Sequence, residues 1–146
     1  MSASFWLRIG AIWGFLAVAM GSFGAHGLRG RFESLGTIPG GIPTERLQAN
    51  FQTATQYQMY CVFALLAVGL LAQAGRGGAA LEVAGWLFLA GSLVFSGSLY
   101  ILYITGEKKL GMITPIGGVA MLAGWIALAI AAGAAGNWAA GEPRTP

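Results

Sequence analysis

Residues 83–105 read VAGWLFLAGSLVFSGSLYILYIT, and this uncharged stretch decides the fold class. A helix that crosses the hydrocarbon core of a bilayer, roughly 30 Å thick, needs about 20 mainly apolar residues. Residues 83–105, 5–25 and 114–135 all meet that length. The apolar run 59–73 meets it only when the polar turn before it, residues 52–58, is included. The sequence therefore predicts an all-α polytopic membrane protein, built as a four-transmembrane-helix bundle.

Composition argues against a water-soluble domain. Of the 146 residues, 56% are hydrophobic and only 9% are charged, and the mean hydropathy is +0.69. A soluble domain usually has about 25% charged residues. We expect one membrane domain over residues 1–146, with no separate catalytic module. Its helices are expected near residues 5–25, 45–74, 83–105 and 114–135, with a loop at 26–44 and a short polar tail at 136–146.

The excess of basic residues indicates membrane orientation, not nucleic-acid binding. The formal net charge is +3, but no basic cluster is longer than Lys108–Lys109. Cytoplasmic loops are enriched in Lys and Arg, and more basic residues fall in the first and third loops than on the opposite side. We therefore expect those two loops in the cytoplasm, both termini outside, and the bilayer as the main partner. The larger group is Arg29, Arg31, Arg46, Lys108 and Lys109, and the smaller group is Arg8, Arg76 and Arg144.

Small residues recur on one face of the first helix and on one face of the fourth. Lipid tails are as apolar as leucine, so membrane helices associate through close packing over small residues. These two ridges predict close backbone contact, either with each other or with another subunit, and ordinary small-residue packing within one bundle is the alternative. They consist of Gly10, Gly14, Ala17, Gly21 and Gly24 in the first helix, and of Gly117, Ala120, Gly124, Ala127 and Ala131 in the fourth.

Polar side chains are expected to gather at one membrane face. The second helix begins with an amphipathic segment, and the third carries a line of Ser and Tyr residues. Thr114 and Pro115 are expected to be the N-cap and first residue of the fourth helix. Connectivity places these helix ends at the same membrane face. Their polar side chains either form hydrogen bonds between helices or line a binding site. The predicted cluster is His26, Gln52, Gln56, Tyr57, Tyr60, Ser96, Tyr100 and Thr114.

Catalytic, cofactor-binding and metal-ligating patterns are not found in the sequence. All five acidic residues are Glu, and each lies in a loop, in a tail or at a helix edge. Buried ionisable residues of the kind that mark proton relays are therefore missing. His26 is the only histidine, which excludes a bis-histidine haem. Cys61 is the only cysteine, which excludes an internal disulfide. We expect no cofactor.

Three stretches together resemble a known family. They are Gly21-Ser-Phe-Gly-Ala-His-Gly-Leu28, then Phe51-Gln-Thr-Ala-Thr-Gln-Tyr-Gln-Met-Tyr60, then Phe95-Ser-Gly-Ser-Leu-Tyr100 with Ile113-Thr-Pro-Ile-Gly-Gly118. In this order they are similar to domain-of-unknown-function family 423, small membrane proteins that include a eukaryotic transmembrane relative. The resemblance implies a four-helix bundle, usually of the bacterial inner membrane, and no established activity. Two departures are Cys61, where the family often has a histidine, and an apparent insertion at residues 36–43.

Three functions remain open at this point. The first is a non-enzymatic accessory or scaffold component that packs through its small-residue ridges against other membrane subunits or a second copy. The alternative is binding or transport of a small neutral solute or a lipid through the polar cluster. An enzyme acting on a lipid comes third, because it would need His26 within hydrogen-bond reach of a carboxylate.

Overall fold

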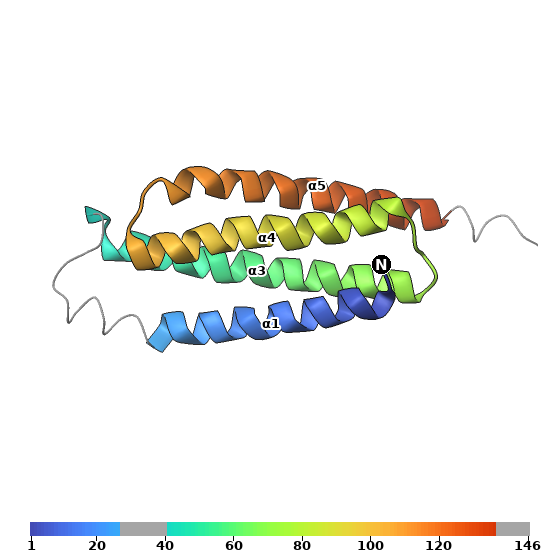
Figure 1. Ribbon diagram of the computed structural model, residues 1–146, viewed down its shortest axis with the longest axis horizontal. Helices are drawn as coiled ribbons and strands as arrows, with labels where there is room; N and C mark the ends of the chain where they lie inside the picture. The colour runs from blue at the N-terminus through green and yellow to red at the C-terminus, as the bar shows by residue number, and fades with distance from the viewer. Residues whose placement is uncertain (27–40, 137–146) are drawn as a thin grey trace, which may run out of the picture.

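Four long helices make up nearly all of the protein that the computed structural model describes, which is residues 1–26 and 41–136 (Figure 1). They are α1 (Ala3–His26), α3 (Thr44–Gln73), α4 (Ala79–Thr105) and α5 (Leu110–Gly136). Each one is long and apolar enough to cross a membrane, and these described residues contain no strand. The predicted four-transmembrane-helix bundle is thereby confirmed.

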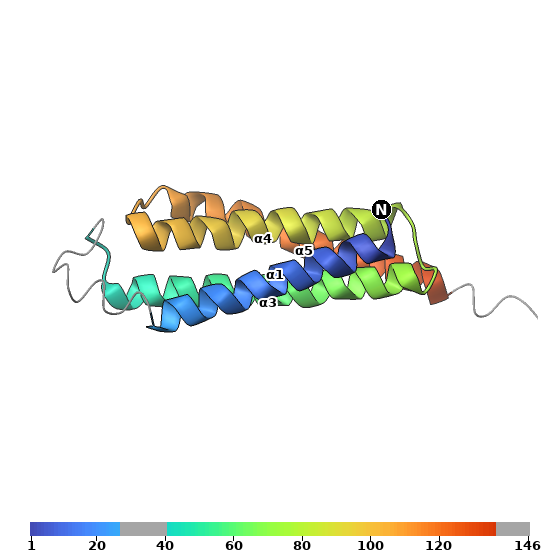
Figure 2. The same ribbon diagram turned by 60° about the horizontal axis from the view of Figure 1, so that its bottom comes forward.

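The helices lie side by side, and each packs against the next one in the chain. α1 packs on α3, α3 on α4, and α4 on α5 (Figures 1 and 2). α3 and α4 are the central pair, since a larger share of each is buried inside the protein than of α1 or α5. The outer helices expose large apolar side chains such as Phe15 and Leu122. In a membrane, these exposed faces contact lipid tails.

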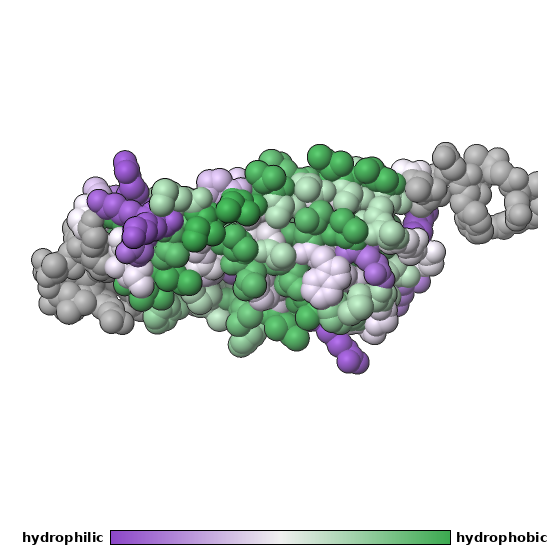
Figure 3. All heavy atoms as spheres, turned by 45° about the horizontal axis from the view of Figure 1, so that its top comes forward, coloured by the Kyte–Doolittle hydropathy of each residue, from purple (hydrophilic) through white to green (hydrophobic). Residues whose placement is uncertain are grey.

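The surface shows the segregation of charge that a membrane requires. In Figure 3, hydrophobic side chains cover the middle of the face, and hydrophilic side chains gather toward its two ends. Glu107, Lys108 and Lys109 are exposed in the turn between α4 and α5. Charged groups placed at the ends of the helices avoid the large cost of burial in hydrocarbon.

Two tryptophans pack together where α1 and α4 begin. Trp6 of α1 is almost completely buried and stacks edge-on against Trp86 of α4, with ring centroids 5.4 Å apart. Gly85 makes this contact possible, because a Cβ there would lie 2.6 Å from the Trp6 ring. The beginning of α1 therefore reaches across to the beginning of α4.

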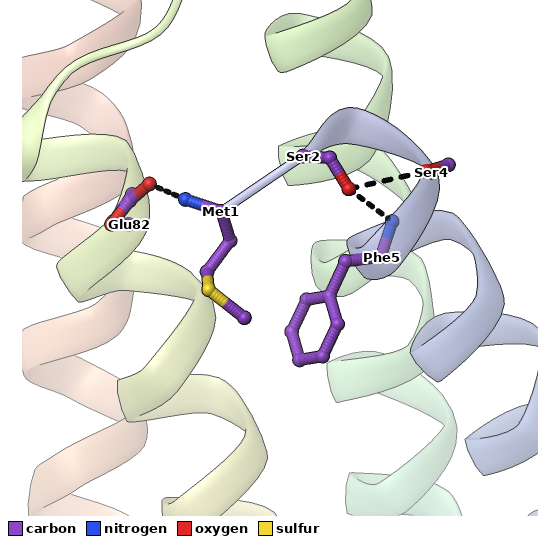
Figure 4. Close-up of polar contacts among 5 residues, drawn as sticks. All are labelled: Met1, Ser2, Ser4, Phe5 and Glu82. Atoms are coloured by element: carbon purple, nitrogen blue, oxygen red, sulfur yellow. Dashed lines mark hydrogen bonds and ion pairs between the residues drawn. The ribbon is translucent and has the colours of Figure 1, made fainter.

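Polar contacts also anchor the start of α1. The Met1 amine forms an ion pair with Glu82 of α4, and the Ser2 hydroxyl accepts a hydrogen bond from the Phe5 amide at 3.3 Å (Figure 4). Both members of the ion pair are more than two-fifths exposed. An ion pair of this kind contributes about 0–1 kcal/mol, so it positions the helix end more than it stabilises the bundle.

Both small-residue ridges pack inside the chain. A Cβ on Gly10 would meet the Leu66 side chain at 2.9 Å, and one on Gly14 would meet Val62 at 3.2 Å, so the first ridge lies on α3. A Cβ on Gly117 would lie 2.6 Å from the carbonyl oxygen of Gly91, so the second ridge lies on α4. The ridges thus serve α1–α3 and α4–α5 packing rather than contact with each other.

The prediction for the start of the fourth helix is wrong. α5 begins at Leu110, and Pro115 lies inside it. Three i→i+3 hydrogen bonds, from the amides of residues 110 to 112, tighten the first turn. The Thr114 hydroxyl does not cap the helix, because it donates back to the Leu110 carbonyl at 3.2 Å. Pro115 removes the donor for the Gly111 carbonyl, which lies at the exposed helix end where water can replace it.

Candidate functional site

A groove of about 590 Å³ lies between the last turns of α1 and the first half of α3. We call it the α1–α3 groove. Its volume is within the usual range for small-molecule sites, about 300–1,000 Å³. The residues that line it are Gly21, Gly24, Ala25, Gln48, Phe51, Gln52, Thr55, Gln56, Met59, Tyr60 and Tyr103.

Glycines on α1 shape this groove. A Cβ on Gly21 would lie only 3.3 Å from the methyl group of Thr55, and the Phe51 ring occupies the space beside Gly24. The two helices therefore approach closely, and the α1 side of the groove is mainly backbone. Side chains of α3 supply almost all of the polar chemistry on the other side.

The α3 side of the groove carries a line of uncharged polar groups. The Gln56 Nε2 group donates to the Tyr60 hydroxyl at 2.6 Å, and the Thr55 hydroxyl donates to the Phe51 carbonyl at 3.1 Å. The amides of Gln48 and Gln52 make no hydrogen bond to any other residue that the structure describes. Gln52, Gln56 and Tyr60 are all exposed, so their polar atoms can be reached from outside the protein.

A second network of polar groups lies inside the bundle, and it meets the groove at Thr55, whose hydroxyl lies 3.2 Å from that of Tyr100. The Tyr100 hydroxyl donates to Oε1 of Gln58 at 2.8 Å, and Nε2 of Gln58 donates to the Trp13 carbonyl at 3.3 Å. The indole N–H of Trp13 donates to the Ser92 hydroxyl at 2.8 Å. Gln58 is only 3% exposed. This buried network joins α1, α3 and α4, and it leaves no buried side-chain polar atom unpaired among the described residues.

The structure divides the predicted polar cluster among several places. Gln52, Gln56 and Tyr60 line the α1–α3 groove. Tyr100 belongs to the buried network, and Ser96 donates to the Ala54 carbonyl at 2.8 Å. Two others lie away from both, and the last cannot be placed. Tyr57 packs its ring on Phe95, Thr114 pairs with Ser98 between α4 and α5, and the side chain of His26 lies outside the described residues.

Sequence reasoning missed Gln58 and Trp13. Gln58 sits one helical turn beyond Thr55, on the face of α3 that points at Tyr100. Trp13 lies in an apolar block, and an indole N–H inside a membrane needs an acceptor. The same feature of the sequence identifies Gln58 and Trp13, because each carries a polar atom within or beside an apolar block.

The described residues contain no group of three or more His, Cys, Asp or Glu side chains that could hold a metal ion. Cys61 is buried, and its sulfur lies 3.2 Å from the sulfur of Met121. The groove itself is lined by amides, hydroxyls, aromatic rings and a thioether. Its chemistry is that of hydrogen bonding and apolar contact.

Comparison with known proteins places the chain among uncharacterised membrane proteins. Residues 20–118 match the family described as protein of unknown function DUF423. The chain belongs to this family. It is 45% identical to the UPF0382 membrane protein YwdK of Bacillus subtilis over 124 residues, which cover 85% of this chain and 92% of the relative. It is 44% identical to the UPF0382 membrane protein SAB0533 of Staphylococcus aureus over 123 residues, which cover 84% and 90% of the two chains. No solved structure matches the chain.

The part of the chain that matches DUF423 contains the whole α1–α3 groove. Residues 20–118 include every lining residue, from Gly21 to Tyr103. They also include Gln58, Ser92 and Tyr100 of the buried network, but not Trp13. The groove therefore lies in the segment by which this chain is identified as a DUF423 protein.

Proposed function

We propose that this DUF423 protein is a non-enzymatic membrane protein that binds a small neutral amphiphile or solute in the α1–α3 groove. The observation that carries the proposal is the exposed amide of Gln52, which has no hydrogen-bond partner among the described residues, in a groove of about 590 Å³. A polar group without a partner in an apolar environment costs roughly 2–7 kcal/mol. A bound molecule that pairs with this amide would offset that cost.

The packing of the ridges favours binding over the accessory-subunit hypothesis. Gly10 and Gly14 lie against Leu66 and Val62, and Gly124 lies against Phe88. A scaffold that used these ridges for other subunits or a second copy would first have to give up its own helix contacts. Such a role would require other surfaces of α1 or α5, and nothing in their exposed apolar faces specifies a partner.

A non-enzymatic role is supported by the residues of the groove. Its hydroxyl groups are those of Thr55, Tyr60 and Tyr103, and no carboxylate, histidine or cysteine is among the lining residues that the structure describes. General acid–base catalysis needs a group that can take up a proton near neutral pH. The lining therefore suits recognition better than chemistry.

We further propose that the protein lies in a bacterial cell membrane, specifically the inner membrane, with both termini outside. The named relatives are bacterial membrane proteins, and an even number of spanning helices places both ends of the bundle on one side. The turn between α4 and α5 carries Lys108 and Lys109. Positive charge of this kind favours the cytoplasmic side.

Native mass spectrometry of the intact particle, gently extracted from its own membranes, tests the binding function. We expect the protein to retain a small stoichiometric mass. The double variant Gln52→Leu/Gln56→Leu should lose that mass, and the control Gln73→Leu should keep it, because Gln73 lies at the far end of α3 and outside the groove. Retention of only other polypeptides, or equal retention by both variants, would contradict the proposal.

A further inference from the structure

The depth of the α1–α3 groove restricts what it can bind. At 1.5 Å per residue, the segment from Gln48 to Tyr60 spans about 18 Å along α3. Tyr60 lies close to midway between Arg46 and Arg76, the basic residues that bracket this helix. The hydrocarbon core is about 30 Å thick. The groove therefore begins near the membrane surface and ends near the middle of the bilayer.

The described lining of the groove carries no charged side chain from Gln48 to Tyr60. Among the described residues that line it, the side-chain polar atoms belong to three glutamines, one threonine and two tyrosines, and none of these residues is Lys, Arg, His, Asp or Glu. An ion that descended to Tyr60 would lose its hydration and meet no opposite charge, at a cost far above that of a hydroxyl group. The groove thus discriminates against charged headgroups.

The deepest polar pair is complementary to a hydroxyl group. Because Nε2 of Gln56 donates to the Tyr60 oxygen at 2.6 Å, the Tyr60 proton remains able to donate. Among the described residues, no acceptor takes that proton, and Oε1 of Gln56 also has no donor. One donor and one acceptor therefore lie next to each other. A hydroxyl, which both donates and accepts, matches both.

Apolar groups line the same groove beside this pair. Phe51, Met59 and the ring of Tyr103 face it, and glycines form its α1 side. A free polyol would leave these surfaces unused, whereas a lipid would cover them with its glycerol–ester region and the first carbons of its chains. The surrounding bilayer can supply such a molecule sideways, since Gln56 and Tyr60 are exposed on the outer surface of the bundle.

We propose that the ligand is an uncharged lipid with a hydroxyl headgroup, of the diacylglycerol class, whose hydroxyl pairs with Gln56 and Tyr60. This inference rests on the proposed function, and it names the ligand class for the same groove. The headgroup lies below the phosphate layer of the bilayer.

The test uses the full-length protein in phosphatidylcholine nanodiscs that contain a small fraction of either dioleoylglycerol or dioleoylphosphatidic acid. These two lipids have the same tails and differ only in the phosphate. Lipid retained after release from the nanodisc is measured by native mass spectrometry. We expect about tenfold or greater preference for dioleoylglycerol, because the charged phosphate cannot enter the groove.

A matched pair of variants locates the hydroxyl. Tyr60→Phe removes the oxygen at the bottom of the groove, and Tyr57→Phe makes the same change one turn away, on a ring that packs against Phe95 outside it. Loss of one hydrogen bond should weaken dioleoylglycerol retention about 2- to 10-fold in Tyr60→Phe and leave Tyr57→Phe unchanged. Gln56→Met provides a second variant that should behave like Tyr60→Phe.

The outcomes separate this inference from the proposed function. Equal or stronger retention of phosphatidic acid would overturn the inference, and so would equal behaviour of the two tyrosine variants. Displacement of the lipid by free glycerol would overturn the lipid as the source of the hydroxyl. If dioleoylglycerol does not bind but a mass from native membranes still depends on Gln52 and Gln56, the inference fails and the proposed function stands. If no mass depends on the groove, both fail.

Discussion

The contact between α4 and α5 should break when one glycine gains a methyl group. A Cβ on Gly117 would lie 2.5 Å from the backbone nitrogen of Phe95 and 2.6 Å from the carbonyl oxygen of Gly91. Favourable contacts between heavy atoms lie at about 3.5–4.0 Å. Both obstacles are backbone atoms of α4, which cannot rotate away as a side chain would. Gly117→Ala therefore requires the two helices to separate by about 1 Å at this point.

The neighbouring glycine gives a matched control. A Cβ on Gly118 would meet only the Phe95 ring, at 3.8 Å, which is an ordinary contact. Replacing glycine by alanine inside a helix gains about 0.5–1 kcal/mol, and that gain is common to both variants. The difference between them isolates the cost of overpacking, typically about 1–3 kcal/mol. Because the clash is with backbone, we expect about 3 kcal/mol, or roughly a hundredfold in the folding equilibrium.

Equilibrium unfolding in mixed micelles, with increasing mole fraction of sodium dodecyl sulfate, measures this difference. Gly118→Ala should match or slightly exceed the stability of the parent protein, and Gly117→Ala should unfold at clearly lower detergent fraction. Equal midpoints for the two alanine variants would refute the close α4–α5 contact. A loss of stability in Gly118→Ala alone would show that the helix is rotated from the position described.

Two further changes test the polar contacts inside the bundle. Gln58→Leu should cost about 1–3 kcal/mol in the same unfolding assay, because it removes the closer acceptor of the Tyr100 hydroxyl and the donor to the Trp13 carbonyl, whereas Gln73→Leu on the exposed end of α3 should change stability little. Ser98→Ala and Thr114→Ala should show a coupling energy of about 0.6 kcal/mol in a double-mutant cycle, because their hydroxyls lie 2.8 Å apart. No coupling would contradict the hydrogen bond between Ser98 and Thr114.

The helices could be predicted because the bilayer requires long apolar segments with few charges. The first residues of the helices were harder to predict where a helix begins with charged residues or contains a proline near its start. α4 begins at Ala79 and includes Glu82, although the apolar stretch that predicted this helix begins only at Val83. α5 includes the turn before Pro115, although proline is common at a first helical position. At a membrane surface, water satisfies polar groups, so neither charge nor proline marks the end of a helix there.

The candidate site was predictable only in part. Helical spacing shows which side chains share one face of a helix, but it does not show which other helix packs against that face. The spacing of Gln52, Gln56 and Tyr60 correctly placed them on one side of α3. It could not show that α1 would cover one edge of that face with Gly21 and leave a groove. Tyr100 was assigned to the same cluster, but the tilt of its side chain toward Gln58 places it inside the bundle. Such choices depend on the packing of three helices together.

The contrast between the polar side chains of the buried network and those of the α1–α3 groove gives the strongest physical argument for binding. Both lie at membrane depth, and both cost free energy if their atoms stay unpaired. In the buried network, Tyr100, Gln58 and Trp13 pair with one another or with backbone, which is sufficient for helix association. In the groove, Gln52 has no partner among the described residues although apolar side chains would fit the same exposed position. The unpaired Gln52 amide raises the free energy of the isolated bundle, and helix packing does not require it. A molecule that binds this amide best explains why it is there.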